Sequence, residues 1–193
     1  MPAIQVRPVI FTDISTLVSI DHSFSTEYVW QMEFQEETGQ VKVGFNERRL
    51  PRAMRVEYPR PSQYLADIWN KKPGLLVAEM AEGEPVGYVN LTDGVIPRTT
   101  QITDLAVTTR MRRQGIGKVL LLAAEDWAVH HGNFQLLLEV QSKNHPAISL
   151  VRKLGYEFCG YSDRYFPNQD IVLFLESLPR IYGFICFCSP DNF

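Results

Sequence analysis

A glycine-rich turn lies between an apolar stretch and a helical pattern, and its residue types suit the binding of an anion. Gly115 and Gly117 lack a Cβ atom, so the backbone of this turn can come close to a ligand. The first N–H groups of a helix have no partner within the helix, and the helix dipole favours an anion there. Arg112, Arg113 and Lys118 add positive charge at the same point. The pattern predicts a pyrophosphate-binding turn; the alternative is an ordinary helix start that contains glycine.

Two common phosphate-binding motifs do not fit this turn. A P-loop needs glycine where Arg112 stands, and serine or threonine where Val119 follows the lysine. A dinucleotide-binding motif needs a third glycine where Leu120 stands. A nucleotide-hydrolysing enzyme is therefore disfavoured, and the turn indicates a different kind of pyrophosphate site.

Strands and helices that position this turn are predicted along the whole chain. Alternating apolar residues or short buried runs predict strands at 4–9, 28–36, 41–45, 75–81, 86–91, 99–107, 135–141, 158–165 and 171–176. Apolar residues at helical spacing predict helices at 14–23, 62–69, 115–131 and 146–154. The five arginines between 48 and 60 indicate either a solvated strand or loop face, or a rim that meets an anionic group.

The bulk composition is that of an ordinary soluble domain. The 193 residues are 45% hydrophobic and 21% charged, with 19 basic and 22 acidic side chains, so the formal net charge is −3. This balance argues against a dedicated nucleic-acid partner. No apolar run reaches the roughly 20 residues that span a bilayer, and the first nine residues do not resemble a signal peptide. We therefore expect a cytoplasmic protein with no nucleic-acid or membrane partner.

Domain organisation is predicted to be simple. We expect a single domain over residues 1–178, followed by an apolar C-terminal tail over 179–193. The tail and the hairpin expected at 28–46 favour a homodimer. None of the three cysteines and four histidines has the spacing of a metal site, so we expect no metal.

The turn and its surroundings resemble the GNAT superfamily of N-acetyltransferases. The stretch Arg112-Arg113-Gln114-Gly115-Ile116-Gly117 matches the pyrophosphate loop of that family, Q/R-x-x-G-x-G/A. Leu105-Ala106-Val107 before the turn resembles the cofactor-binding strand. Downstream, 139–144 with Ala147, and Lys153-Leu154-Gly155-Tyr156, resemble the next strand with its asparagine and the closing motif. The resemblance is specific over about 102–156, and the whole layout most resembles the streptothricin acetyltransferase-like branch.

The resemblance implies a fold, a cosubstrate and a set of binding residues. The fold would be a mixed α/β (α+β) one, with a twisted, mostly antiparallel sheet of six or seven strands and helices on both faces. Acetyl-CoA would lie where the strands 99–107 and 135–141 diverge. Its pantetheine arm would pair with a strand edge and its pyrophosphate would meet the turn. The residues implied in cofactor binding are Leu105, Ala106, Val107, Arg112, Arg113, Gln114, Gly115, Ile116, Gly117, Lys118 and Asn144. Asn144 could instead be a simple helix N-cap, or could serve both roles.

The implied reaction is the direct attack of a primary amine on the acetyl thioester in a ternary complex. A neutral-pH amine is protonated, so a group must accept its proton, and a backbone N–H at the divergence would stabilise the oxyanion. The catalytic candidates are Asp104 first, then Glu139, with Asp93 also considered. A carboxylate within a hydrophobic strand is costly unless it has a task or a partner. Asp104 could therefore instead only organise the side chain of Arg112 or Arg113.

One position departs from the family pattern. The family often places a tyrosine four residues before Gly155 to protonate the departing thiolate, and Val151 stands there. Tyr156, Tyr161, Tyr165 or solvent would have to replace it, since a thiol of pKa about 8.5 is a tolerable leaving group. The departure motivates an alternative function, a non-catalytic acyl-CoA-binding module. The acceptor amine stays open among a small amine, an antibiotic and a protein N-terminus.

Overall fold

The fold is an antiparallel-rich sheet with a protruding hairpin. The computed structural model describes residues 4–60, 63–70, 74–81 and 83–178. The main sheet has seven strands in the order β1-β4-β5-β6-β7-β9-β8, with bounds β1 Ile4–Pro8, β4 Gly74–Met80, β5 Pro85–Thr92, β6 Thr99–Val107, β7 Gln135–Gln141, β8 Glu157–Ser162 and β9 Val172–Ser177. All neighbouring strands are antiparallel except β6 and β7, which are parallel. The expected mixed, mostly antiparallel sheet is confirmed.

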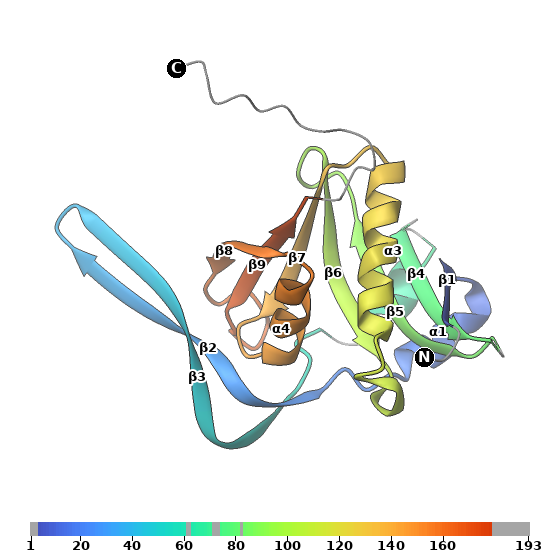
Figure 1. The fold of residues 1–193 in the computed structure, drawn as a ribbon, viewed down its shortest axis with the longest axis horizontal. Helices are drawn as coiled ribbons and strands as arrows, with labels where there is room; N and C mark the ends of the chain where they lie inside the picture. Colours follow the sequence, from blue (N-terminus) through green and yellow to red (C-terminus); the bar gives the residue numbers. More distant parts are fainter. Residues whose placement is uncertain (1–3, 61–62, 71–73, 82, 179–193) are drawn as a thin grey trace.

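Helices cover both faces of this sheet, as expected (Figure 1). Their bounds are η1 Phe11–Asp13, α1 Ile14–Val18, α2 Tyr64–Ile68, η2 Thr109–Met111, α3 Ile116–His130 and α4 His145–Lys153. The helices α3 and α4 pack on one face in the larger apolar core, and α1 and α2 pack on the other face in a smaller core. None of the helices in the described ranges is long and apolar enough to cross a membrane.

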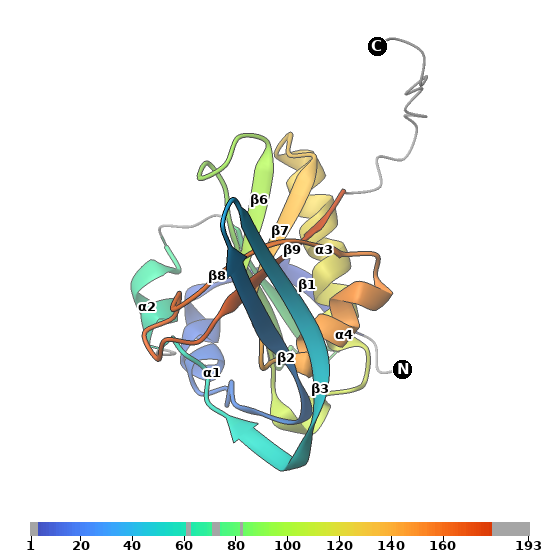
Figure 2. The same cartoon turned by 90° about the vertical axis from the view of Figure 1, so that its left-hand side faces the viewer.

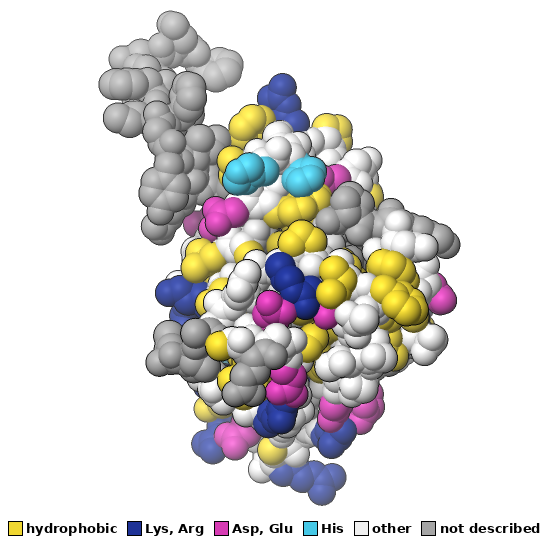
Figure 3. Space-filling model, turned by 90° about the vertical axis from the view of Figure 1, so that its right-hand side faces the viewer, with side chains coloured by type: hydrophobic (Ala, Val, Ile, Leu, Met, Phe, Trp, Pro, Cys, Tyr) yellow, Lys and Arg dark blue, Asp and Glu magenta, His cyan; other side chains and the backbone are white. Residues whose placement is uncertain are grey.

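The helix α3 contributes most of the apolar contacts on its face of the sheet. Its buried stripe consists of Ile116, Leu120, Leu121, Ala124 and Ala128. Val119, Ala123 and Trp127 lie beside this stripe and are only partly buried. Figure 3 shows the side of the molecule to the right of Figure 1, where apolar, basic and acidic side chains are intermixed.

The strands β2 (Phe24–Glu37) and β3 (Gln40–Val56) form a separate two-stranded sheet that projects from the body as an arm (Figures 1 and 2). The expected return strand over 41–45 was too short, because β3 continues through the arginine-rich stretch to Val56. The register skips residues 50–53, which include Pro51, a residue that has no N–H to donate. Arg48 and Arg55 form exposed ion pairs on this arm, so most of the stretch is a solvated strand face.

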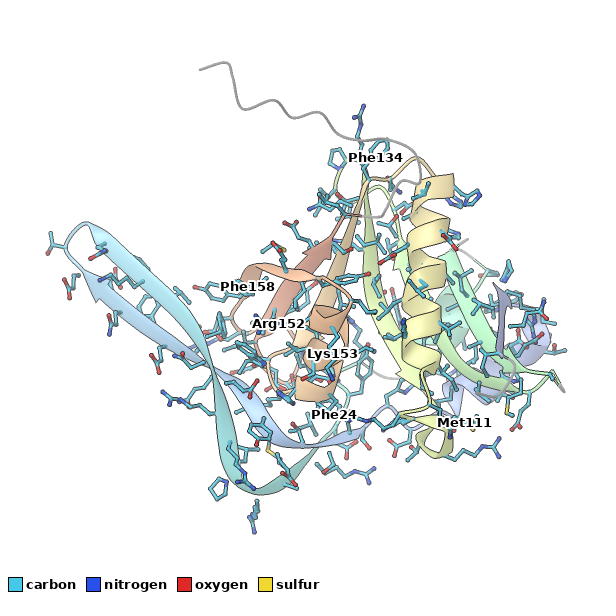
Figure 4. All side chains as sticks on the ribbon, in the orientation of Figure 1. Phe24, Met111, Phe134, Arg152, Lys153 and Phe158 are labelled. Atoms are coloured by element: carbon cyan, nitrogen blue, oxygen red, sulfur yellow. The ribbon has the colours of Figure 1, made fainter. Side chains whose placement is uncertain are left out.

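The base of the arm rests on the body. Backbone N–H of Trp30 donates to the carbonyl of Ser142 at 2.9 Å, and the guanidinium of Arg152 stacks over the Trp30 ring. Trp30, Phe45 and Phe158 line an apolar cavity of about 160 Å³ between the arm and the body. Figure 4 shows Arg152 and Phe158 on the side of the body that faces the arm. The apolar face of the hairpin is thus partly buried at its base.

The strands β6 and β7 pair over a short length only, and this determines the shape of the middle of the main sheet. The two strands pair only from Thr99 with Gln135 to Ile102 with Leu138. Beyond these pairs they diverge, which opens the sheet between residues 103–107 and 139–141 (Figure 1). The divergence expected from the family resemblance is therefore present.

A β-bulge in β6 lies at the start of this divergence. Asn90 pairs with Asp104 and Leu91 with Ile102, so Thr103 is the extra residue. The bulge reverses the alternation of side chains: Ile102 packs in the core under α3, whereas Asp104 faces the opposite side with Ala106. Without the bulge, Asp104 would share the apolar face of Ile102.

We predict that Leu120→Ala lowers the free energy of unfolding by about 2–5 kcal/mol, because Leu120 is fully buried between α3 and the sheet. Leu122 is 44% exposed on the same helix, so Leu122→Ala should change it by less than about 0.5 kcal/mol. Urea unfolding followed by circular dichroism measures both. Equal losses for the two variants would contradict the observed placement of α3.

Candidate active site

The glycine turn has the geometry of an anion cradle. Arg113 and Gly115 have positive φ angles of 65° and 90°, and α3 begins at Ile116. Within the described chain, no acceptor is recorded for the backbone N–H groups of residues 113–118, whereas the N–H of Val119 donates to the carbonyl of Gly115. A run of free N–H groups at a helix N-terminus forms a concave site for a phosphate group. The N–H groups are thus available to an anion, and the binding of a pyrophosphate at this turn stays a prediction.

The basic side chains of the turn have different surroundings. Arg113 and Lys118 are exposed beside the free N–H groups, and Gln114 is exposed as well. Arg112 instead donates to the carbonyls of Val107 at 2.9 Å and Ser23 at 2.7 Å, and also to the carbonyl of Asp21. Burial lowers the pKa of Arg112. Its side chain therefore ties the turn to the chain segment before the arm.

The helix α4 closes one side of the cradle. A Cβ atom on Gly117 would lie 3.1 Å from the Leu150 side chain of α4, so glycine permits the close approach of the two helices. Asn144 is the N-cap of α4, and its Oδ1 accepts the N–H of Ala147 at 3.1 Å. The N-cap interpretation of Asn144 is thus correct for its oxygen, and no acceptor in the described chain is recorded for its Nδ2. Since Asn144 follows β7 and the turn follows β6, both lie at the open end of the divergence.

The strand edge between these features is open. The residues Leu105, Ala106 and Val107 lie on β6 beyond the last pair with β7, while β5 covers their other edge. The side chains of Leu105 and Val107 pack on the core under α3, and Ala106 packs in the smaller core. The backbone of β6 therefore has no strand partner on its β7 side over these residues, within the described chain. An extended ligand with amide groups has room to pair there.

A polar cavity of about 440 Å³ lies at the start of the divergence. It brings together Asp104 from β6 and Glu139 from β7, the two carboxylates that the sequence suggested as catalytic candidates. Arg60 lies between them, and Thr92, Gln101 and Tyr165 are among the other lining residues. Asp93, the third candidate, is exposed and accepts a hydrogen bond from Thr100 at 2.7 Å, so the structure does not bring it to this cavity.

Both carboxylate oxygens of Asp104 have hydrogen-bond donors. The Tyr58 hydroxyl donates to Oδ1, while the Asn90 amide and the Thr103 hydroxyl donate to Oδ2 at 2.9 Å each. Arg60 also approaches Oδ1, at 3.5 Å. The suggestion that Asp104 organises Arg112 or Arg113 is wrong: the arginine beside it is Arg60.

Glu139 has a simpler environment. Its Oε2 accepts the Nη2 of Arg60 at 2.5 Å, and its side chain is 5% exposed. Burial and the charge of Glu139 raise the pKa of Tyr165, the tyrosine beside it in the cavity. Tyr165 also forms a hydrogen bond with Glu139, so two side chains are recorded as bonding Glu139, compared with the four around Asp104.

No pattern in the sequence clearly predicted the buried polar residues behind Asp104. Burial, and then the charge of Asp104, raise the pKa of Tyr58 well above its ordinary value. Burial also raises the pKa of Tyr88, which bonds Nε2 of His22 at 2.9 Å, and lowers the pKa of His22. Asn90, a fully buried amide in a largely apolar strand, was the clearest local signal for this cluster.

The structure separates the three tyrosines that could compensate for Val151. Val151 is fully buried in the core. Tyr156 is buried under α3, and Tyr161 packs against Phe45 of the arm. Tyr165 lines the polar cavity that contains Asp104 and Glu139. Of the three, Tyr165 is thus the one placed beside the candidate catalytic carboxylates.

Comparison with known proteins agrees with this geometry. The Acetyltransferase (GNAT) family model matches residues 44–156, which span the end of the arm, the divergence, the cradle and α4. The chain belongs to the GNAT acetyltransferase family. Streptothricin acetyltransferase of Streptomyces lavendulae is 30% identical over 154 residues, which cover 77% of this chain and 78% of that relative.

Solved structures share the fold of this GNAT family member over nearly its whole length. A nourseothricin acetyltransferase superposes with a TM-score of 0.76 at 23% identity, covering 92% of this chain and 99% of the other. A structure from Bacillus anthracis str. Ames, named after streptothricin acetyltransferase and holding acetyl coenzyme A, has a TM-score of 0.72 at 18% identity. It covers 91% of this chain and 99% of the other.

We predict that the double variant Arg113→Glu/Lys118→Glu lowers the affinity for acetyl-CoA by about 10- to 100-fold, because it reverses two charges beside the free N–H groups. Both side chains are exposed, so the melting temperature should change little. Calorimetric titration measures the affinity. Lys42→Glu, an exposed charge reversal on the arm, is the control and should bind like wild type. Unchanged affinity in the double variant would remove the cradle from the site.

Proposed function

We propose that this protein transfers the acetyl group of acetyl-CoA to a primary amine of a cationic acceptor of the streptothricin type. The observation that carries the proposal is the pair of buried carboxylates at the β6–β7 divergence, within the same opening as the anion cradle. The streptothricin-related relatives support the acceptor class. A protein N-terminus and other small amines are the competing acceptors.

The proposed cosubstrate site uses backbone groups more than side chains. The N–H groups of residues 113–118 would hold the pyrophosphate, and the free edge at 105–107 would pair with the pantetheine arm. Nδ2 of Asn144 is free to bond the same ligand while Oδ1 caps α4. When bound, acetyl-CoA supplies the activated acetyl thioester. The side chain of Arg112 would hold the turn in place rather than bind the cosubstrate, because it donates to backbone carbonyls.

The carboxylates would bind the acceptor amine and accept its proton. A primary amine arrives as an ammonium ion, which the two carboxylates attract more strongly than in water because their side chains are buried. Glu139 is our choice for the proton acceptor, directly or through a water molecule, because Asp104 already has donors on both oxygens. Asp104, which the sequence favoured, would hold and orient the ammonium group. Tyr165 lines the same cavity and is our choice for the group that returns a proton to the departing thiolate.

A non-catalytic acyl-CoA-binding module is the second candidate function. Val151 at the usual tyrosine position favours it, because no side chain there can donate a proton. The acidic cavity argues against it, since a binding module for an anionic cosubstrate has no need of two buried carboxylates beside that ligand.

Direct assay of the wild-type protein tests the proposal. We expect that incubation with acetyl-CoA and streptothricin yields free CoA and an antibiotic that is heavier by one acetyl group, measured by mass spectrometry. Spermidine and a peptide with a free N-terminus test the competing acceptors. Saturable acetyl-CoA binding with no acetylated product from any acceptor would establish the binding module instead.

We predict that Glu139→Gln lowers kcat by about 10²- to 10⁴-fold, the usual contribution of a general base. Asp104→Asn should act mainly on the KM of the acceptor, because it removes a charge that holds the ammonium group while leaving the proton acceptor in place. Steady-state kinetics at saturating acetyl-CoA separates the two effects. A larger kcat loss in Asp104→Asn than in Glu139→Gln would restore Asp104 as the base.

A further inference from the structure

The guanidinium of Arg60 occupies a cation site between the two carboxylates. Its Nη2 donates to Oε2 of Glu139 at 2.5 Å, and its Nη1 donates to the carbonyl of Thr103 at 2.7 Å. Oδ1 of Asp104 lies 3.5 Å from the same Nη1. Burial alone would lower the pKa of Arg60, but the neighbouring Tyr58 and the carboxylates raise it above its ordinary value. The site therefore holds a fully charged group and is shaped to receive one.

Arg60 enters this site from the surface, and the carboxylates lie behind it. Its side chain is 23% exposed, compared with 7% for Asp104 and 5% for Glu139. Asp104 and Glu139 belong to the central strands, whereas Arg60 follows β3 in the segment that leads to α2. Phe166 lies under the guanidinium, with its ring centre 5.3 Å from Cζ. Because Arg60 is partly exposed and belongs to a connecting segment, its side chain can leave the site without any change in the sheet.

The proposed reaction needs this same place for a different cation. The acceptor amine must reach the divergence of β6 and β7, where the two carboxylates lie, and it arrives with a positive charge. If Arg60 stayed in place, a second cation would be repelled by its positive charge. Only one of the two carboxylates would then be left uncompensated to attract it. Departure of Arg60 alone would leave two buried like charges, which is unfavourable. Exchange of one cation for another avoids both penalties.

We propose that, in the free protein, the guanidinium of Arg60 occupies the site of the acceptor's ammonium group. The acceptor then binds by displacing Arg60 from between Asp104 and Glu139. This inference rests on the proposed function and deepens it. It defines the substrate class as amines that carry a positive charge at the entering end. Neutral amines cannot displace the arginine, because they would leave the carboxylate pair without a cation.

The cavity in front of Arg60 suits an acceptor larger than a simple alkylamine. Its volume of about 440 Å³ falls in the range of small-molecule sites, and Thr92, Gln101 and Tyr165 contribute polar groups to its wall. A polar amine with several hydrogen-bonding groups matches this lining better than an apolar one. Streptothricin and spermidine are suitable probes, because both present primary ammonium groups.

The test is the equilibrium affinity of streptothricin and spermidine for the Arg60→Gln variant, measured by calorimetry in the presence of CoA. Because Arg60 must first be displaced, the apparent affinity equals the affinity of the open site multiplied by the fraction of molecules in which the site is open. We expect binding to become about tenfold tighter in Arg60→Gln, if the open state is populated at about one part in ten. Arg60→Lys keeps a competing cation and should bind nearly like wild type.

Two further variants make the result specific. Arg98 stacks over the ring of Phe134 in a similar way but does not line the acidic cavity, so Arg98→Gln should leave the affinity unchanged. Phe166→Leu keeps the charge of Arg60 but removes the ring beneath it, so it should tighten binding to a smaller extent. This variant also provides a test if Arg60→Gln does not fold, which circular dichroism would reveal.

Several results would overturn the inference. Equal or weaker binding of both probes to folded Arg60→Gln would show that Arg60 contacts the acceptor or only stabilises the fold. Absence of binding of both probes to wild type and variants would also overturn it. Failure of the proposed function is a separate result, because it appears as acetyl-CoA binding without acetylated product, whatever the affinity for the amine.

Discussion

The divergence of β6 and β7 is the constraint on which the rest of the site depends. The two parallel strands exchange backbone hydrogen bonds over four residue pairs, and then each continues without the other. Unpaired strand edges inside a domain need partners, so this opening is stable only if side chains, solvent or a ligand complete the hydrogen bonds. On one side the edge of 105–107 is open beside the N–H cradle of the turn. At the start of the opening, the carbonyl of Thr103 is satisfied by Arg60.

The bulge at Thr103 connects the opening to the chemistry. A regular strand would place Asp104 on the apolar side under α3, where a carboxylate would lack donors. The extra residue turns Asp104 toward Tyr58, Asn90 and Arg60, and toward the cavity that also contains Glu139. The bulge thus brings together one carboxylate from each of the two diverging strands. In the proposed mechanism, Arg60 compensates the negative charge of these two carboxylates until the acceptor binds.

Local patterns in the sequence predicted the cradle and most of the elements. The turn at 112–117 is recognisable because its glycines, its arginines and the start of α3 are adjacent in the chain. The pairing of Asp104 and Glu139 with Arg60 was not predictable, because it joins residues that are 44 and 79 positions apart. The bulge depends on the register with β5, and the length of β3 depends on its pairing with β2, so neither leaves a clear local pattern. The tail expected at 179–193 and the first residue of the helix expected at 62–69 lie outside the described residues.

An anionic cosubstrate and a cationic acceptor would share one opening in the proposed complex, and an experimental structure with CoA and streptothricin is the decisive test. We predict that the CoA pyrophosphate lies on the N–H groups of residues 113–118, and that an ammonium group of the antibiotic lies between Asp104 and Glu139, with Arg60 turned outward. CoA bound elsewhere, or the antibiotic bound outside the cavity with Arg60 still between the two carboxylates, would contradict this prediction.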